Sequence, residues 1–317
     1  MAQPLKICLI GAGYWGKNYI KLLQSMGTNF NFIGIVEKSE SIKKTIIDNY
    51  NIRIFDDITE TYELCDCYII ATPVKTHYSI AKDCILQGKN IMVEKPLTDS
   101  YEKTKELINL AKSKNIKLMT NFTPIYTEPM KFIKNYIANK LDKIRYISLK
   151  RSNLGIIRND CDVIIDLTCH DISMLLFLVE SMPENIFPIS KSFINDDIDM
   201  VSINMKYPNF ISHVYTSRID NLKQREIVII TEDERITYDD TNTVNPIIIN
   251  NNNITKEDGK ICYNYNNTII PNIIFKEPLK NQLLDFYNSV INNCDPISNS
   301  KLSLNVNKLI ENIYDKL

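Results

Sequence analysis

Residues 6–16 read KICLIGAGYWG, a short apolar run that leads directly into the spacing G-x-G-x-x-G. The run predicts a strand and the residues after it predict a helix over Trp15–Met26, which is the context in which this motif binds a dinucleotide. Gly11 allows the tight turn, Gly13 lets the backbone approach a pyrophosphate, and Gly16 lets the helix pack closely on the sheet. Three of the chain's eight glycines stand here. We therefore predict that a dinucleotide contacts Gly11, Gly13, Tyr14, Trp15 and Gly16; the alternative is a purely structural turn.

The rest of the first 123 residues continues the alternation of strand and helix. Helical patterns lie between the apolar runs, as in Thr76–Gln87 and Tyr101–Ser113. This rhythm predicts an α/β domain built on a doubly wound parallel sheet. The predicted strands are Lys6–Ile10, Phe30–Val36, Ile52–Phe55, Cys67–Ala71, Ile91–Glu94 and Lys117–Thr120.

The pattern changes after residue 123. Helices are predicted at Met130–Ala138 and Asp166–Val179, followed by extended segments with alternating apolar residues and by two closing helices. This predicts an α+β domain with a mainly antiparallel sheet, open on one face. We therefore divide the chain into a dinucleotide-binding domain, 1–123, and a domain for substrate binding and oligomerisation, 124–317. Because an exposed apolar face is usually buried in an interface, we expect a homodimer or homotetramer.

The bulk composition is that of an ordinary globular protein of two domains. The 317 residues carry a formal net charge of -1, so no overall field attracts nucleic acid or an anionic membrane. The N-terminal apolar run is too short for a signal peptide, and no stretch approaches the roughly 20 apolar residues of a membrane span. These features predict a cytoplasmic protein with a small-molecule substrate and neither nucleic-acid nor membrane partners.

Eight cysteines occur, and none forms a C-x-x-C pair. Several lie in apolar stretches, which is typical of buried reduced thiols. Only Cys169 beside His170 hints at clustered metal ligands. We therefore expect no metal site.

Glu37 stands at the end of the second predicted strand, 21 residues after Gly16. An acidic residue at this place accepts hydrogen bonds from the adenosine ribose hydroxyls, and its charge repels a 2′-phosphate. This predicts NAD as the cofactor. Lys38 keeps NADP as the alternative, since a neighbouring cation can bind that phosphate.

Two further motifs carry a family resemblance. The fourth strand leads into Ala71-Thr72-Pro73 with His77 four residues on, and the fifth ends at Glu94-Lys95-Pro96. With the glycine loop, these residues resemble the Gfo/Idh/MocA oxidoreductases, whose signature is Glu-Lys-Pro after the fifth strand. Segments 151–160, 166–172 and 277–286 resemble a branch of that family that acts on nucleotide-linked sugars. The resemblance covers nearly the whole chain and implies a Rossmann domain that binds NAD or NADP.

Lys95 is the residue that this resemblance marks most clearly. Ligands of open α/β sheets bind outside the carboxyl ends of the strands, and Lys95 follows such an end. We expect it to hydrogen-bond the reacting hydroxyl, whereas a solvated structural lysine is the alternative. The resemblance also implies a cis bond between Lys95 and Pro96, and it predicts a cofactor surface that includes Thr72, Pro73, His77 and Glu94. His77 is expected to shape the cofactor end of the site rather than to act as a base.

Asp166 and His170 lie four residues apart on a predicted helix, so they share one face. Oxidation of an alcohol requires a base, and imidazole titrates near neutrality. We therefore predict His170 as the general base and Asp166 as its partner, with Lys95 as the alternative base. The candidate substrate contacts, which are ordinary polar surface residues in the alternative interpretation, are Arg151, Asn153, Arg158 and Asp160.

Together these motifs predict an NAD-dependent dehydrogenase that transfers hydride between nicotinamide and a sugar C3 hydroxyl or ketone. The resemblance implies a UDP-N-acetylhexosamine or its uronate as substrate. Within enzymes, the alternatives are a 3-ketosugar reductase and an inositol or other sugar dehydrogenase. A non-catalytic NAD-binding regulator on the same fold is the alternative of another class.

Overall fold

The computed structural model describes residues 3–157 and 161–317. The chain divides into two compact units. Unit 1 comprises Met1–Thr123 and Glu277–Asn307, and unit 2 comprises Pro124–Lys276 and Lys308–Leu317.

Unit 1 is built on a six-stranded sheet in which every pair is parallel, in the order β3-β2-β1-β4-β5-β6. The predicted doubly wound sheet is therefore confirmed. The central strands are apolar without alternation because elements cover both of their faces, and Cys67–Ile70 is completely buried. The strands are β1 (Leu5–Ile10), β2 (Phe30–Val36), β3 (Ile54–Phe55), β4 (Cys67–Ile70), β5 (Asn90–Glu94) and β6 (Leu118–Asn121).

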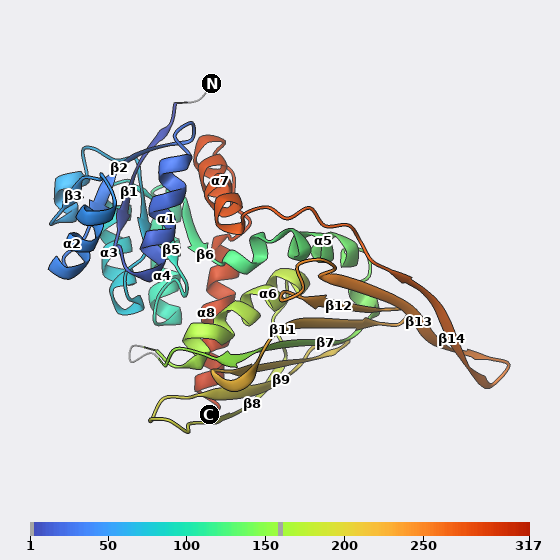
Figure 1. Cartoon of the computed structure of the whole chain (residues 1–317). Coiled ribbons are helices and arrows are strands. Elements are labelled where there is room, and N and C mark those ends of the chain that lie inside the picture. The colour runs from blue at the N-terminus through green and yellow to red at the C-terminus, as the bar shows by residue number, and fades with distance from the viewer. Residues whose placement is uncertain (1–2, 158–160) are drawn as a thin grey trace. The chain divides into compact units, whose positions relative to one another are not determined.

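The helices of unit 1 pack on both faces of this sheet (Figure 1). The side chain of Leu9 reaches towards α1, whereas Cys8 joins a core cluster with Cys84 of α3 and Leu107 of α4. Successive residues of a strand point to opposite faces, so α1 lies on one face and α3 and α4 on the other. The helices are α1 (Tyr14–Ser25), α2 (Glu40–Asn49), α3 (Val74–Leu86), α4 (Tyr101–Ser113) and α7 (Pro278–Ile291), with a 3-10 turn η1 (Ile58–Thr61).

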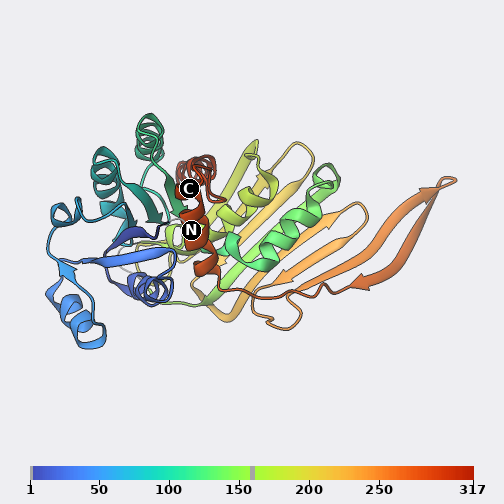
Figure 2. The same ribbon diagram turned by 90° about the horizontal axis from the view of Figure 1, so that it is seen from above.

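Unit 2 holds an eight-stranded sheet in the order β14-β13-β12-β11-β7-β10-β9-β8, antiparallel except where β7 pairs with β10. This confirms the predicted mainly antiparallel sheet. The strands are β7 (Ile144–Leu154), β8 (Asn185–Lys191), β9 (Met200–Lys206), β10 (Ile211–Ser217), β11 (Ile219–Thr231), β12 (Arg235–Asp239), β13 (Ile247–Glu257) and β14 (Lys260–Ile269). Figure 2 shows the β13–β14 hairpin extending well beyond the strands that the helices cover.

One face of this sheet is buried and the other is exposed. Leu149, Val214 and Ile203 are adjacent in register and buried, whereas Phe187 and Ile189 on β8 point to the opposite face and are exposed. Helices α5 (Glu128–Ile137) and α6 (Cys169–Val179) lie across one face of the sheet in Figure 2. A π-helical turn, η4 (Ile164–Thr168), leads into α6, and the short 3-10 turns are η2 (Thr123–Tyr126) and η3 (Leu141–Lys143).

The closing helices correct the predicted domain limits. The sequence pattern predicts that all of 124–317 belongs to the second domain, but α7 and residues 300–307 of α8 (Ser300–Tyr314) belong to unit 1. The Tyr287 ring meets Phe30 edge-on at 5.7 Å, and Asn307 donates to the carbonyl of Thr98 at 2.8 Å. An amphipathic pattern shows that a helix has a buried face, but it does not show which sheet buries it.

The structure also shows where the cysteines lie and whether any helix could span a membrane. Five of the eight cysteines are buried thiols, while Cys161 and Cys262 are partly buried and Cys294 is exposed. Within 3–157 and 161–317, no helix has both the length and the apolar character needed to cross a bilayer.

Candidate functional site

The carboxyl ends of β1, β2, β4 and β5 bring the predicted cofactor residues of unit 1 to one edge of the sheet. Gly11 follows β1, Glu37 follows β2, Thr72 follows β4, and Lys95 follows β5. This is the edge at which parallel α/β sheets bind their ligands.

The three glycines of the loop are required for different reasons. Gly11 has a φ of +88°, and a Cβ on it would lie 2.8 Å from the carbonyl oxygen of Ala71. A Cβ on Gly16 would collide with the carbonyl of Gly11, because α1 passes so close to the loop. An added Cβ on Gly13 would meet no atom of the protein within 4 Å. Gly11 and Gly16 therefore serve the fold, whereas Gly13 leaves open space on the outer side of the loop.

This loop fits a pyrophosphate. Gly13 is the residue before the first turn of α1 and supplies no side-chain cap, so the helix amides are not satisfied by a capping side chain. Such amides and the positive end of the helix dipole bind anions. Beside them Tyr14 is 79% exposed, and its ring meets that of Trp15 edge-on at 5.8 Å.

The Glu37 carboxylate is held in place by the backbone. One oxygen accepts from the amide of Ala12 at 2.9 Å, and the other accepts from the amide of Ser39 at 2.8 Å. The partly exposed carboxylate thus stands beside the glycine loop, while Lys38 is exposed. The sequence predicts the location of this carboxylate but not the two hydrogen bonds that it accepts from backbone amides.

His77 joins two loops of the cofactor edge. Its ring is 1% exposed, with Nε2 2.8 Å from the Thr72 carbonyl oxygen and Nδ1 3.0 Å from that of Pro96. Burial lowers the pKa of His77, and the bonds to these carbonyls oppose that shift. The side chain is therefore placed to hold the loops after β4 and β5. Pro73 is exposed at the start of α3.

The Glu-Lys-Pro segment divides its side chains between the interior and the surface. The Lys95–Pro96 bond is cis, as the resemblance implied, and Lys95 is partly exposed. Glu94 is 7% exposed and accepts a hydrogen bond from the hydroxyl of Tyr19 at 2.8 Å and another from the amide of Asn121. The expectation that Glu94 contacts the cofactor therefore needs correction, because its carboxylate points into unit 1.

Asp166 and His170 lie in unit 2 on one continuous helical segment. Asp166 is in the π-helical turn η4, and His170 is in the first turn of α6. Short π-helical turns occur often at functional sites. Asp162, which sequence reasoning missed, accepts from the amides of Ile164 at 2.9 Å and Ile165 at 3.1 Å and so caps this segment. An Asp just before an apolar helical pattern was the available signal.

Arg151 differs from its predicted role. Its Nε lies 3.0 Å from Oδ1 and 3.1 Å from Oδ2 of Asp171, and the two side chains are 10% and 2% exposed. The guanidinium is thus engaged inside unit 2 and offers little surface to a substrate. Asn153 is partly buried near the end of β7, and the predicted contacts Arg158 and Asp160 lie outside the described residues.

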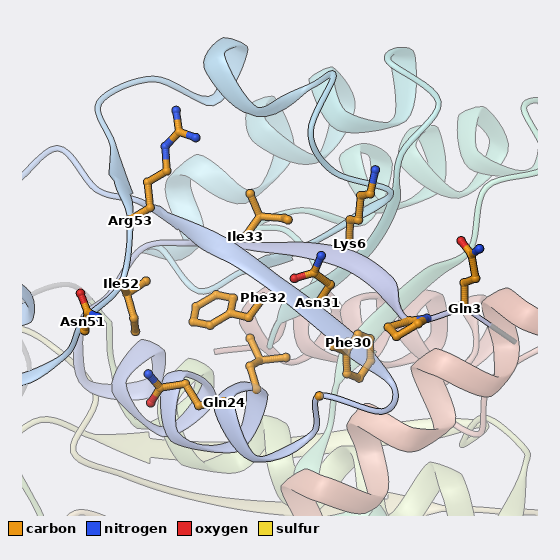
Figure 3. A pocket seen from close by; sticks show the side chains of 13 residues that line it. Gln3, Lys6, Gln24, Phe30, Asn31, Phe32, Ile33, Asn51, Ile52 and Arg53 are labelled. Atoms are coloured by element: carbon orange, nitrogen blue, oxygen red, sulfur yellow. The ribbon is translucent and has the colours of Figure 1, made fainter. Parts of the chain in front are cut away.

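A cavity of about 730 Å³ opens at the opposite edge of the unit 1 sheet. It is bordered by the amino ends of β1 and β2 and by the end of α1 (Figure 3). Lys6, Ile33 and Arg53 extend to one side of β2 in this view, whereas Phe32 and Gln24 lie on the other. The cavity contains none of the predicted site residues.

Several known proteins are similar to this chain. A UDP-N-acetylglucosamine 3-dehydrogenase of Acidithiobacillus ferrooxidans is 21% identical over 235 residues, 73% of this chain and 72% of that one. An inositol 2-dehydrogenase of Corynebacterium glutamicum is 22% identical over 255 residues, 77% of this chain and 68% of its own length.

The similarity in structure extends over the whole chain. The solved structure of the A. ferrooxidans enzyme matches with a TM-score of 0.86 at 19% identity, covering 100% of this chain and 98% of that one. The aldose-aldose oxidoreductase of Caulobacter crescentus matches with a TM-score of 0.81 at 14% identity, covering 99% and 97%. At these identities the likeness establishes the fold.

The family assignment rests on the segment that carries the glycine loop and Glu-Lys-Pro. Residues 5–122 match the model of the oxidoreductase family with an NAD-binding Rossmann fold. The N-terminal domain of this chain therefore belongs to the Gfo/Idh/MocA family of NAD-binding oxidoreductases.

Proposed function

We propose that this oxidoreductase oxidises the C3 hydroxyl of a nucleotide-linked sugar, a UDP-N-acetylhexosamine or its uronate, with NAD. The observation that carries the proposal is the placement of Lys95 directly after β5, on the edge that also holds the glycine loop. The similarity to a UDP-N-acetylglucosamine 3-dehydrogenase supports the substrate class.

NAD fits the cofactor edge by the chemistry of its residues. The amides at the start of α1 would hold the pyrophosphate, with Gly13 leaving room for it. Glu37, oriented by the amides of Ala12 and Ser39, would accept hydrogen bonds from the ribose hydroxyls, and its charge would repel a 2′-phosphate. This favours NAD over NADP. When bound, the cofactor supplies the acceptor for the hydrogen and electron pair that leave C3.

In this proposal three side chains act on the C3 hydroxyl, either directly or through another side chain. Lys95 Nζ donates a hydrogen bond to the C3 oxygen and stabilises the negative charge that develops there. The imidazole of His170 accepts the hydroxyl proton, and Asp166 orients the ring and stabilises its protonated form. Lys95 as the base remains the alternative. Asn153, Arg158 and Asp160 are proposed substrate contacts.

The decisive experiment combines a substrate panel with matched variants. The full chain is incubated with NAD or NADP and a series of UDP-sugars, dTDP-sugars and inositol, and nicotinamide absorbance is followed. We expect turnover with NAD and a UDP-sugar. Lys95→Met and His170→Gln should each lower kcat by about 10²–10⁴-fold. The controls Lys112→Met, on the exposed end of α4, and His213→Gln, on β10, should leave kcat unchanged.

The outcomes separate the alternatives. Turnover of inositol or a free sugar alone would assign another sugar dehydrogenase. Tight NAD binding without turnover of any sugar would favour a regulator. Full activity in Lys95→Met would contradict the mechanism. If His170 is the base, His170→Gln loses the acidic limb of the pH–rate profile; if the limb stays, the base is Lys95.

A further inference from the structure

The backbone on both sides of Lys95 is hydrogen-bonded or adjacent to a buried polar side chain, Glu94 on one side and His77 on the other. Glu94 precedes it, and the carbonyl of Pro96, which follows it, faces the ring of His77 at 3.0 Å. Lysine carries a charge on a long flexible stem, so the position of its Nζ depends on how firmly the backbone beneath it is held.

The Glu94 side of this arrangement ties three elements together. The carboxylate at the end of β5 accepts from Tyr19 of α1 at 2.8 Å and from Asn121 at the end of β6, and Asn121 also donates to the Tyr19 hydroxyl. The second carboxylate oxygen accepts from the amide of Lys95 itself at 3.3 Å. Glu94 thus bonds directly to the backbone that carries Lys95.

The network continues behind Asn121. The hydroxyl of Thr123 donates to the Asn121 side-chain oxygen at 2.7 Å and approaches Oε1 of Gln282 on α7 at 3.4 Å. Tyr19 and Gln282 are completely buried, and Asn121 is 2% exposed. A buried polar group that loses its partner costs free energy, so such a network has few arrangements open to it. Burial raises the pKa of Glu94, and the bonds from Tyr19 and Asn121 oppose that shift.

The His77 side holds the other end of the segment. The ring lies between the carbonyls of Thr72 and Pro96, with one ring nitrogen 2.8 Å from the first oxygen and the other 3.0 Å from the second, so it contacts both the loop after β4 and the loop after β5. Thr72 in turn packs against Gly11, where an added Cβ would lie 2.8 Å from its Cγ2. His77 therefore connects the Lys95 segment to the glycine loop.

We propose that Glu94, through Tyr19 and Asn121, and His77 are positioning residues that hold Lys95 against the reacting hydroxyl. None of them touches the substrate in this proposal. This proposal rests on the proposed function for the role of Lys95. The claim that Glu94, Tyr19, Asn121 and His77 order the backbone of residues 94–97 does not depend on that function. A misplacement of about 1 Å in a reacting group can cost about 100-fold in rate.

Two matched tyrosine variants test this proposal. Tyr19→Phe removes the hydroxyl bonded to Glu94. Tyr68→Phe removes an equally buried hydroxyl of the same unit, on strand β4, which is bonded to Thr61 at 2.9 Å and lies outside the network. Both should lower Tm, and Tyr19→Phe should lower it more, because that variant leaves the buried Glu94 carboxylate with one donor fewer. Tyr19→Phe should lower kcat by about tenfold or more at nearly unchanged KM, whereas Tyr68→Phe should stay within about twofold of the native chain.

A second measurement does not depend on activity. Hydrogen exchange at the backbone amides of Glu94, Lys95 and Leu97 should speed up in Tyr19→Phe and in His77→Leu and remain native in Tyr68→Phe. Glu94→Gln should retain more kcat than Glu94→Leu, because a Gln oxygen still accepts from Tyr19 and Asn121. Equal kcat and equal exchange in the two Phe variants would overturn the proposal. If the native chain oxidises no sugar, the proposed function fails while the exchange result still decides whether these residues hold the segment.

Discussion

Gly13 differs from the other two glycines of the loop, because its replacement is expected to affect cofactor binding without affecting the fold. Gly11 requires a left-handed backbone and Gly16 a close approach to the loop, so their replacement would disturb unit 1 itself. Gly13 has an ordinary φ of -66° and free space around it. We therefore expect that glycine is required at position 13 for the proposed cofactor and not for the fold.

We expect Gly13→Ala to fold as the native chain does and to bind NADH at least tenfold more weakly, because the methyl group occupies the space that a pyrophosphate needs. Gly27→Ala is the matched control, since a Cβ there also meets nothing within 4 Å. Thermal unfolding and NADH fluorescence titration check both variants. Native affinity in Gly13→Ala would argue against a dinucleotide at this loop.

Helix α6 is attached to the sheet of unit 2 by a buried ion pair. Asp171 in its first turn binds Arg151 of β7, and Thr216 of β10 lies 3.5 Å from the same carboxylate. Burial raises the pKa of Asp171, and the neighbouring guanidinium opposes that shift. Because Asp171 follows His170 directly, this pair also fixes the backbone of the proposed base.

Breaking this pair should be costly, since it leaves a buried charge without its partner. We expect Asp171→Asn to lower the free energy of unfolding by about 3–5 kcal/mol, and the double variant Arg151→Met, Asp171→Leu to recover much of the loss. Asp99→Asn, which breaks an exposed pair with Lys103, should cost at most about 1 kcal/mol. Urea unfolding measures all three. An Asp171→Asn loss no larger than that of Asp99→Asn would show that the pair does not hold the helix.

The open face of the unit 2 sheet continues into the projecting hairpin. The turn at Asp258 and Gly259 has positive φ at both residues, as a tight hairpin requires. Ile254 pairs with Tyr263, and these side chains share one exposed face with Tyr265, which is 82% exposed. The opposite hairpin face is polar, with Asn264 bonded to Asn253 at 2.9 Å. An isolated hairpin with an exposed apolar face is marginally stable in water.

We therefore expect the chain to assemble as a homodimer or homotetramer that covers this face. Light scattering after size exclusion should show the oligomer for the native chain. Ile254→Ser combined with Tyr265→Ser should shift it towards the monomer, while Thr255→Ser on the polar face should not. A native chain that is monomeric at micromolar concentration would refute this expectation.

The parallel sheet of unit 1, its glycine loop and the location of Lys95 could be predicted because each depends on a local pattern. Strand period, turn residues and the Gly and Pro positions are properties of neighbouring residues. The Asp-Gly turn in the β13–β14 hairpin is a signal of the same kind.

The partners of buried polar groups depend instead on contacts between distant parts of the chain. Glu94 turns inward because Tyr19 and Asn121 offer it donors, and Arg151 is buried because Asp171 lies opposite. Residues 277–307 join unit 1 because Phe30 and Thr98 meet them there. A charged side chain or an amphipathic helix can be exposed or buried. Which of the two occurs depends on whether the folded chain places a suitable partner beside it.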